Sequence, residues 1–455
     1  MSKQLFNEFS EVSTKQWKQK IQYDLKGADY NETLIWKTNE GIDVKPFYHL
    51  SECTNNILHV NTKATQWHIC QTIFVANTEK SNTKALDLLQ RGAESLKFII
   101  PSPTISFSEL TKGIDLSITP VILELHFLDD TYIKQLSILP SSYKISVQND
   151  IISHLASSGN WYHNIELDHE YFTNNVLQSS SISVNVGLYQ NAGANMVQQL
   201  AYALAHVSEY LNHFNTLSSK EKHLINVTFN VAVGSNYFFE IAKLRALRIL
   251  WIALANEFDF NSECQINVTP TKRNKTLYDY NTNMLRTTTE CMSAILGGAN
   301  TISNLAYDAI YHKDNEFGER ISRNQLLILK HESYFDKVDN PADGTYYIET
   351  LTHQLSEKAL ELFKDIEANG GFLHQLKEGI IQRKIKESAS KEQEQFNTGE
   401  IVLLGTNKHP NVNDKMKDEL ELYPFIKTNP VKTLIEPIIE RRLAELLEQK
   451  RLQDE

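Results

Sequence analysis

The sequence predicts an α/β protein built on a parallel sheet, and two observations point to this class. Short runs of apolar and β-branched residues recur along the chain, as buried strands require. Longer segments between and after these runs carry apolar residues at spacings of three and four, which is typical of amphipathic helices. Strands that alternate with helices pair in parallel through crossover connections. Between about residues 55 and 390, the elements fit either a (β/α)₈ barrel or a doubly wound sheet.

Residues 1–50 are expected to form a separate N-terminal helical arm. One helical pattern covers residues 17–25, and the turn-forming run 26–29 follows it. The predicted strands begin after the arm, because this is where the apolar runs start. They are 57–60, 96–100, 121–127, 182–189, 224–233 and 264–268.

Three long amphipathic helices are predicted among and after these strands, at 197–214, 239–253 and 351–366. The third should end at Gly370 and Gly371, since glycine commonly terminates a helix. After about residue 390 the chain becomes charged and glutamine-rich, and it closes with a predicted solvated helix at 434–453. We therefore expect a barrel domain over 51–390 and a C-terminal helical extension over 391–455.

Composition excludes several classes of function. The chain of 455 residues has a formal net charge of -11 and no basic cluster, which argues against a nucleic-acid partner. No stretch approaches the roughly 18–20 apolar residues of a membrane span, so we expect no membrane association and a cytoplasmic location. The four cysteines are widely spaced and fit reduced thiols better than disulfides or a zinc site. They are Cys53, Cys70, Cys264 and Cys291.

Three stretches of sequence resemble the methylmalonyl-CoA mutase family. Residues 237–251 (YFFEIAKLRALRILW) are similar to the family helix F-F-x-E-I-A-K-L-R-A-x-R-x-L-W. Residues 279–300 carry an Asp, then N-x-x-R-T, then L-G-G, as the family does, and 320–349 is similar in order and spacing. Weaker similarity in the arm, at 24–27 and 41–46, extends the resemblance over nearly the whole chain.

The resemblance implies a (β/α)₈ TIM-type barrel that encloses an acyl-CoA thioester. In complete subunits of the family a cobalamin domain with the motif D-x-H-x-x-G follows. The reaction is a radical rearrangement of methylmalonyl-CoA to succinyl-CoA, in which the cofactor supplies the radical and the protein positions the substrate. Catalytic residues of such barrels lie at the carboxyl ends of the strands.

The catalytic segment of the family, S-G-Y-H-M-Q-E-A-G-A, is degenerate at the matching residues 185–194. Gly187 stands where the family has Tyr, and Leu188 stands where it has the His that hydrogen-bonds the thioester carbonyl. Leucine has no donor and cannot stabilise charge on a carbonyl oxygen. We expect Leu188 to continue the buried face of a strand instead. Gln190 is retained and is a vestigial substrate-binding residue by resemblance.

A second catalytic motif, R-Q-Y-x-G-F, is also degenerate. Cys70 replaces the Arg that binds carboxylate, and Thr72 replaces the Tyr that assists bond homolysis. The family's H-S-Q is absent from residues 264–275, and no D-x-H-x-x-G occurs in the sequence. By resemblance, this chain alone binds no cofactor or metal, and adenosylcobalamin is expected on a partner subunit.

Other candidate sites are weak. The sequence has no G-x-S-x-G nucleophile elbow. Gly297 and Gly298 fit a close backbone contact better than a phosphate loop, and Arg286 and Glu290 have the spacing of a structural pair. Five histidines lie among the predicted elements without metal-ligand spacing and are expected at the surface or hydrogen-bonded in the core. They are His59, His68, His126, His331 and His353.

These observations favour the small, non-catalytic subunit of a heterodimeric, adenosylcobalamin-dependent methylmalonyl-CoA mutase, paired with a catalytic large subunit. A regulatory barrel that binds CoA esters without radical chemistry is the alternative, and the retained Gln190 is its support. A third interpretation, an independent isomerase with relocated catalytic groups, has no residue in its favour.

Overall fold

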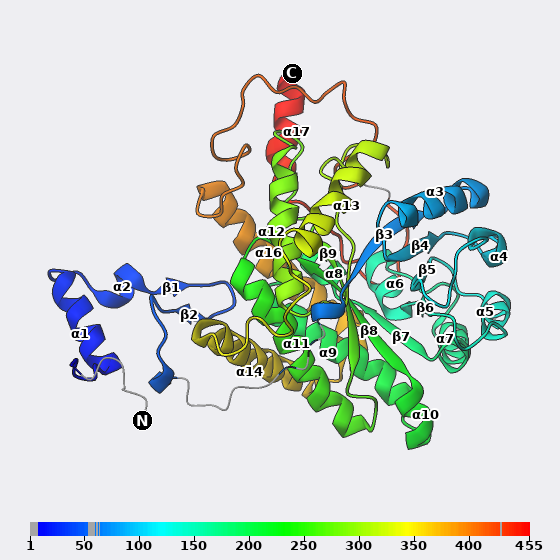
Figure 1. The fold of residues 1–455 in the computed structure, drawn as a ribbon, viewed down its shortest axis with the longest axis horizontal. Coiled ribbons are helices and arrows are strands. Elements are labelled where there is room, and N and C mark those ends of the chain that lie inside the picture. The colour runs from blue at the N-terminus through cyan, green and yellow to red at the C-terminus, as the bar shows by residue number, and fades with distance from the viewer. Residues whose placement is uncertain (1–7, 53–59, 61, 63, 428–429) are drawn as a thin grey trace.

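The centre of the protein is a barrel of eight parallel strands, seen in a computed structural model that describes residues 8–52, 60, 62, 64–427 and 430–455. Adjacent strands follow the order of the chain, and the last strand pairs with the first. The predicted TIM-type barrel is therefore confirmed (Figure 1). The strands are β3 (His68–Phe74), β4 (Ser95–Ile100), β5 (Val121–Leu125), β6 (Ile145–Gln148), β7 (Ser181–Asn185), β8 (Asn226–Val233), β9 (Cys264–Pro270) and β10 (Thr301–Ile302).

The barrel has a seam between β6 and β7. These strands lie side by side, but the sheet as described contains no hydrogen-bonded ladder between them. The hydroxyls of Ser146 and Ser181 are 3.5 Å apart across the seam. At the carboxyl end of β7, the backbone N–H of Asn185 donates to the Asp150 carboxylate at 2.8 Å. Side chains thus replace backbone pairing where the barrel closes.

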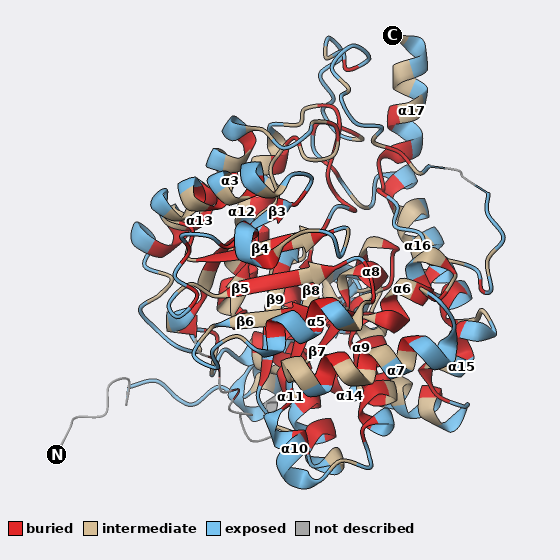
Figure 2. Cartoon of the chain, turned by 90° about the vertical axis from the view of Figure 1, so that its right-hand side faces the viewer, coloured by how far each residue is buried: buried red, intermediate tan, exposed pale blue. Residues whose placement is uncertain are grey.

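Helices surround the barrel, and the buried residues concentrate between them and the strands (Figure 2). The largest apolar cluster joins strands β7–β9 to their covering helices, while a second cluster lies around β3–β5. The helices between and after the strands are α3 (Thr78–Gln90), α4 (Phe107–Leu110), α5 (Asp130–Ser137), α6 (Ile151–Ser158), α7 (Ile165–Ser179), α8 (Gly187–Asn191), α9 (Met196–His213), α10 (Ser219–Leu224), α11 (Tyr237–Phe258), α12 (Thr282–Leu296), α13 (Glu316–His331), α14 (Tyr346–Ala368), α15 (Phe372–Lys377), α16 (Ile380–Thr398) and α17 (Glu445–Asp454).

Local sequence explains where the long helices begin and end. Helix α9 starts at Asn195 through a capping box in which Asn195 and Gln198 satisfy each other's backbone N–H groups. Helix α14 stops before Gly370 and Gly371, which both have positive φ, so the predicted glycine stop is confirmed. The three long helices predicted from periodicity are present as α9, α11 and α14.

Three predictions about the elements are wrong or incomplete. The strand predicted over 182–189 ends at Asn185, and Leu188 belongs to the short helix α8. The predicted helix over 434–453 is helical only from Glu445, because residues 430–444 run without regular structure along the barrel. Strands β3, β6 and β10 were not predicted, and the expected strand at 57–60 lies largely outside the described residues.

The N-terminal arm contains α1 (Thr14–Asp24), α2 (Tyr30–Leu34) and the small antiparallel pair β1 (Trp36–Lys37) and β2 (Asp43–Val44). It projects away from the barrel in Figure 1. Its inner end is attached, because Ile42 and Val44 are buried in the main apolar cluster. Its outer helix α1 has no buried residue. The proposed domain limits at residues 50 and 390 stay predictions, and α16 continues across residue 390.

The predicted close contact at Gly298 is confirmed. A Cβ atom at this position would clash with the Thr62 side chain, and φ is +84°. The predicted pair of Arg286 with Glu290 is wrong. Glu290 instead pairs with Lys275 at 2.8 Å, because the loop after β9 places that ammonium inside the protein beside α12.

Candidate functional site

The carboxyl ends of the strands open into a polar lumen, which is where barrel enzymes carry their sites. A cavity of about 460 Å³ lies against β4–β8, and a smaller one of about 130 Å³ adjoins it toward β9 and β10. Lys97, Asn185 and Asn230 line both cavities. The barrel interior is therefore hollow and hydrophilic at this end.

An ion pair and a histidine lie together in the lumen, on β4, on β5 and just after β5. The Lys97 ammonium on β4 lies 2.5 Å from one oxygen of Glu124 on β5, and His126 Nε2 lies 3.0 Å from the other. Burial by itself would raise the pKa of Glu124, but Lys97 and His126 outweigh burial and lower it to about 2. Glu124 is thus a carboxylate at neutral pH, with both oxygens engaged within the protein.

A second group of polar residues connects the lumen to the core at the seam. Asp150, which follows β6, lies 3.0 Å from His206 Nε2 and accepts a 2.7 Å hydrogen bond from the Tyr210 hydroxyl. The Tyr189 hydroxyl lies 2.9 Å from the other nitrogen of His206. Although burial opposes the charge, His206 and Tyr210 lower the pKa of Asp150. Asp150 also caps helix α6 through the N–H of Ser153.

Residues at the degenerate family positions do not rebuild a catalytic centre. Leu188 is 4% exposed, packs in the main apolar cluster and lines neither lumen cavity. The expectation that it extends a strand is wrong because the chain turns into α8 after Asn185, but its burial is as expected. Gly187 lines the smaller cavity, where an added Cβ would meet Ala232 at 3.6 Å.

The degenerate motif on β3 carries two small side chains, Cys70 and Thr72, at the family's catalytic positions. Thr72 is exposed, whereas Ile69 and Ile73, of opposite parity on the strand, are buried against helices. Cys70 shares a face with Thr72 and is fully buried, which raises the pKa of its thiol. Cys70 is a free thiol, as are Cys264 and Cys291, so these cysteines are reduced as predicted.

Gln190, the retained family residue, lies outside the lumen. Its amide oxygen accepts from Lys243 Nζ at 3.0 Å, and its amide nitrogen donates to Glu240 at 3.3 Å. The Lys243 ammonium also donates to the Gln199 side-chain oxygen at 2.9 Å and to the Ala232 carbonyl at 2.8 Å. It forms an ion pair with Glu240 at 2.6 Å. Both the oxygen and the nitrogen of the Gln190 amide are therefore hydrogen-bonded within a buried network.

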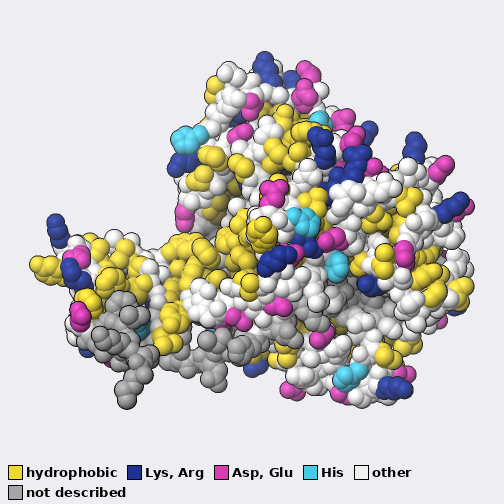
Figure 3. Space-filling model, viewed as in Figure 1, with side chains coloured by type: hydrophobic (Ala, Val, Ile, Leu, Met, Phe, Trp, Pro, Cys, Tyr) yellow, Lys and Arg dark blue, Asp and Glu magenta, His cyan; other side chains and the backbone are white. Residues whose placement is uncertain are grey.

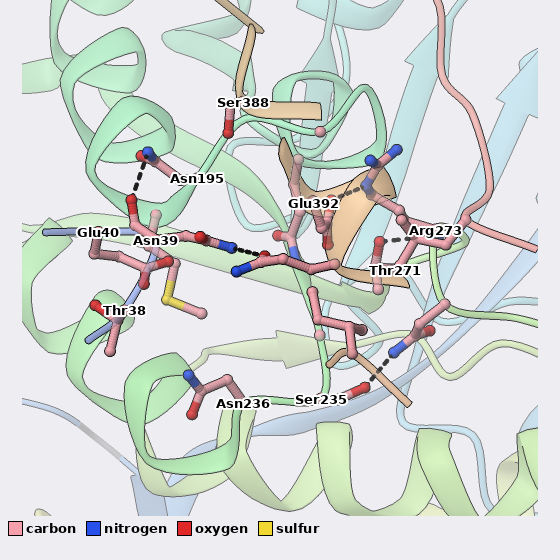
Figure 4. Close-up of a pocket in the computed structure, with 18 of the residues that line it drawn as sticks. Thr38, Asn39, Glu40, Asn195, Ser235, Asn236, Thr271, Arg273, Ser388 and Glu392 are labelled. Carbon is pink, nitrogen blue, oxygen red and sulfur yellow. Dashed lines mark hydrogen bonds and ion pairs between the residues drawn. The ribbon is translucent and has the colours of Figure 1, made fainter. Parts of the chain in front are cut away.

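This network forms one wall of a cavity of about 490 Å³, which lies among the arm, the loops after β8 and β9, and α16 (Figure 4). Asn195 donates to the backbone of Asn39, and Arg273 pairs with Glu392 at 2.5 Å across its opposite side. Burial raises the pKa of Glu40, another lining residue. The arm thus completes a polar chamber beside the barrel mouth.

Most residues that line these cavities were not predicted from the sequence. Lys97 and Glu124 interrupt the apolar runs of β4 and β5, and this was the available signal, since a lone charge inside a buried strand needs a partner. His126 was expected at the surface or hydrogen-bonded, and it is half exposed beside Glu124. In the described ranges no group of three or more His, Cys, Asp or Glu is placed to hold a metal ion.

Helices long and apolar enough to cross a bilayer do not occur among the residues that the structure describes.

Comparison with known proteins finds sequence similarity to methylmalonyl-CoA mutases. The methylmalonyl-CoA mutase family model matches residues 130–445. The methylmalonyl-CoA mutase small subunit of Porphyromonas gingivalis is 33% identical over 453 residues, which covers 92% of this chain and 73% of that protein. A methylmalonyl-CoA mutase of Rhizobium meliloti is 28% identical over 94% of this chain and 68% of its own length. The large subunit from the same Porphyromonas strain is 28% identical over 61% of this chain and 40% of its own.

Proposed function

Because the chain belongs to the methylmalonyl-CoA mutase family, we propose that it is the small, non-catalytic subunit of a heterodimeric methylmalonyl-CoA mutase of propionate metabolism in the cytoplasm. In this proposal a catalytic large subunit holds adenosylcobalamin and isomerises methylmalonyl-CoA to succinyl-CoA. A relative that is 33% identical over 92% of this chain is itself named a small subunit, and a large subunit occurs in the same organism.

The observation that carries the proposal is the fate of the family's catalytic positions. Leu188 packs into the core, and the amide of Gln190 is engaged by Lys243 and Glu240. A thioester carbonyl in the lumen would receive no hydrogen bond from either residue. Loss of one well-placed donor costs roughly 100- to 1000-fold in rate in other enzymes.

Residues at the mouth do not fit a bound cobalamin. The imidazole of His126 lies against Glu124, and that of His154 stacks on Tyr162 with 3.6 Å between ring centroids. Neither presents an unengaged ring that could ligate a metal ion. In this proposal the partner would therefore hold adenosylcobalamin.

A surface suited to such a partner extends from the arm onto the barrel (Figure 3). We use the name arm face for four exposed aromatic residues of the arm and of helices α11 and α14: Trp17, Trp36, Phe238 and Tyr346, which are 50%, 51%, 47% and 38% exposed. Aromatic side chains are enriched at protein interfaces, where they act as anchors. An apolar face of this kind on an outlying arm supports a protein partner, and in this proposal that partner is the large subunit.

Two assays test the proposal. The chain is purified alone and supplied with adenosylcobalamin and methylmalonyl-CoA, and succinyl-CoA is measured with and without the large subunit. We expect no turnover by the chain alone and full turnover by the pair. Succinyl-CoA formed by the isolated chain, or failure of the two chains to copurify, would contradict the proposal.

The second candidate is a CoA-ester-binding regulatory barrel, and the hollow polar lumen favours it. Calorimetric titration of the chain with succinyl-CoA distinguishes the two functions. A purely structural subunit gives no heat of binding, whereas a regulatory barrel gives a saturable signal.

A further inference from the structure

Two histidines meet on the outer helices of the barrel. His169 lies on α7 and His213 on the last turn of α9, with ring centroids 5.3 Å apart and ring planes inclined by 57°. His169 is half-buried and His213 is exposed, so solvent reaches the pair. Neither residue lines the lumen cavities or the chamber beside the arm. The pair is thus separate from the sites described above.

Hydrogen bonds fix which nitrogen of each ring carries the proton. His169 Nδ1 lies 2.7 Å from the Ile165 carbonyl, which can only accept, so Nδ1 carries the proton. The Thr173 hydroxyl donates to the His169 carbonyl at 2.7 Å and lies 2.6 Å from His213 Nε2. Because its single hydrogen is used, Thr173 accepts from the Nε2–H of His213. The neutral rings therefore keep their lone pairs at Nε2 of His169 and Nδ1 of His213.

The chemistry and the spacing of the two rings suit a shared metal ion. Burial and the nearby His169 ring both lower the pKa of His213, which favours the neutral imidazole that a metal ion requires. Imidazole nitrogens are ligands that suit zinc, nickel and copper ions. Two imidazoles bound to one tetrahedral ion at Zn–N distances of about 2.0–2.1 Å have ring centroids roughly 5 Å apart. The observed spacing of the histidines matches this value.

The helices hold the pair in place through buried rings. Phe172, on α7, is 1% exposed and stacks on Tyr210 of α9 with ring centroids 4.4 Å apart. The same ring packs against Phe214, the residue after His213, at 5.8 Å. These contacts fix the backbone of both helices beside the histidines. A ligand pair that is positioned before binding loses less conformational entropy when the ion arrives.

We propose that His169 and His213 together bind one divalent transition-metal ion, such as zinc or nickel, through Nε2 and Nδ1 respectively. Water fills the remaining coordination positions, since no group of three or more His, Cys, Asp or Glu in the described part of the chain is placed to hold a metal ion. The bound ion links α7 to α9. The inference goes beyond the proposed function and does not depend on the partner subunit.

Calorimetric titration of the full-length chain, free of any histidine tag, tests the site with zinc chloride, nickel chloride and magnesium chloride. We expect saturable binding of one zinc or nickel ion per chain. Magnesium should give no signal, because this ion prefers oxygen ligands. Nickel should also raise the thermal midpoint by about 3 °C at 100 times its dissociation constant, since the two rings meet only in the folded chain.

Histidine variants assign the ion to the pair. His169→Gln and His213→Gln should each weaken zinc binding at least about 10-fold, because either change removes one of the two protein ligands. His223→Gln is the matched control and should leave the affinity unchanged. Its Nδ1 also lies close to the carbonyl four residues earlier, at 2.9 Å from Ser219, but this histidine is on α10. Circular dichroism first establishes that each variant is folded.

A threonine variant tests how the His213 ring is positioned. Thr173→Val removes the acceptor that holds Nε2–H and should weaken zinc binding about 10-fold, as loss of a partner behind a metal ligand does. Thr83→Val is its control, because the Thr83 hydroxyl likewise donates to the carbonyl four residues earlier, that of Glu79, on helix α3. Thr83→Val should bind zinc as the parent chain does.

Each outcome either supports the site or overturns it. Zinc or nickel binding that is weakened in both histidine variants and in Thr173→Val, and kept in both controls, supports it. Absence of binding by the folded parent chain, equal binding of magnesium, or unchanged affinity in any of these three variants overturns it. A loss in His223→Gln as large as that in His169→Gln also overturns it, because the pair is then not what holds the ion.

Discussion

The buried network around Lys243 offers the sharpest test of how the retained family residue is held. Lys243 is 1% exposed and Glu240 is fully buried, and their 2.6 Å ion pair is surrounded by Gln190, Gln199 and the Ala232 carbonyl. Lys243→Met leaves the Glu240 carboxylate buried without its cation. Removing one partner of a buried pair costs about 3–5 kcal/mol. We expect that loss in the free energy of unfolding.

Urea unfolding of Lys243→Met, Glu240→Gln and the double variant measures the coupling directly. The double variant should be destabilised by roughly 1–3 kcal/mol less than the sum of the single changes, because it leaves no isolated charge. Lys37→Met, an exposed lysine that lines the same chamber, is the control and should change stability by less than about 0.5 kcal/mol. A loss below about 1 kcal/mol in Lys243→Met, or strict additivity in the double variant, would refute the network as described.

Three further outcomes are expected. Trp17→Ser should weaken binding of the large subunit by at least about 10-fold, measured by interferometry, because exposed aromatic anchors carry interface energy. Gly298→Ala should lower the unfolding free energy by about 1–3 kcal/mol more than Gly399→Ala, the typical cost of overpacking, since both have φ above +80° but only the former would place a Cβ against Thr62. The folded-state pKa of Glu124 is lowered from 4.5 to about 2, so its stabilisation is present above pH 4.5 and is lost as pH falls toward 2; the thermal midpoint of Glu124→Gln should fall less than that of the parent between pH 5 and pH 3.

Periodicity was sufficient to find the long elements because their signal extends over several turns. Helices α9, α11 and α14 bury continuous stripes, and the sequence shows them. Strand β10 has two residues and β6 has four, so neither carries enough apolar alternation to be detected. The strand predicted through residue 189 was too long because the apolar phase of β7 continues into the helix α8.

The candidate site was only partly predictable, for a different reason. Leu188 and Gly187 could be placed because they interrupt a contiguous motif that the resemblance supplies. Lys97 and Gln148 belong to no such motif, and they meet only because the barrel brings β4 and β6 to one lumen. Spacing along the chain carries no information about neighbours that are formed by closure of a sheet.

The stretch that most resembles the family proves to be scaffold. On α11, Arg245 pairs with Glu349 at 2.7 Å and also with Asp343, and Arg248 donates to the Gly298 carbonyl at 2.6 Å. These guanidinium groups tie the helix to neighbouring segments and touch neither lumen cavity. A motif of this kind identifies how the barrel is assembled, because the same buried partners are needed whether or not chemistry follows. The chemistry of the lumen is set by other residues, since polar side chains from several strands surround Gln148 in the larger cavity.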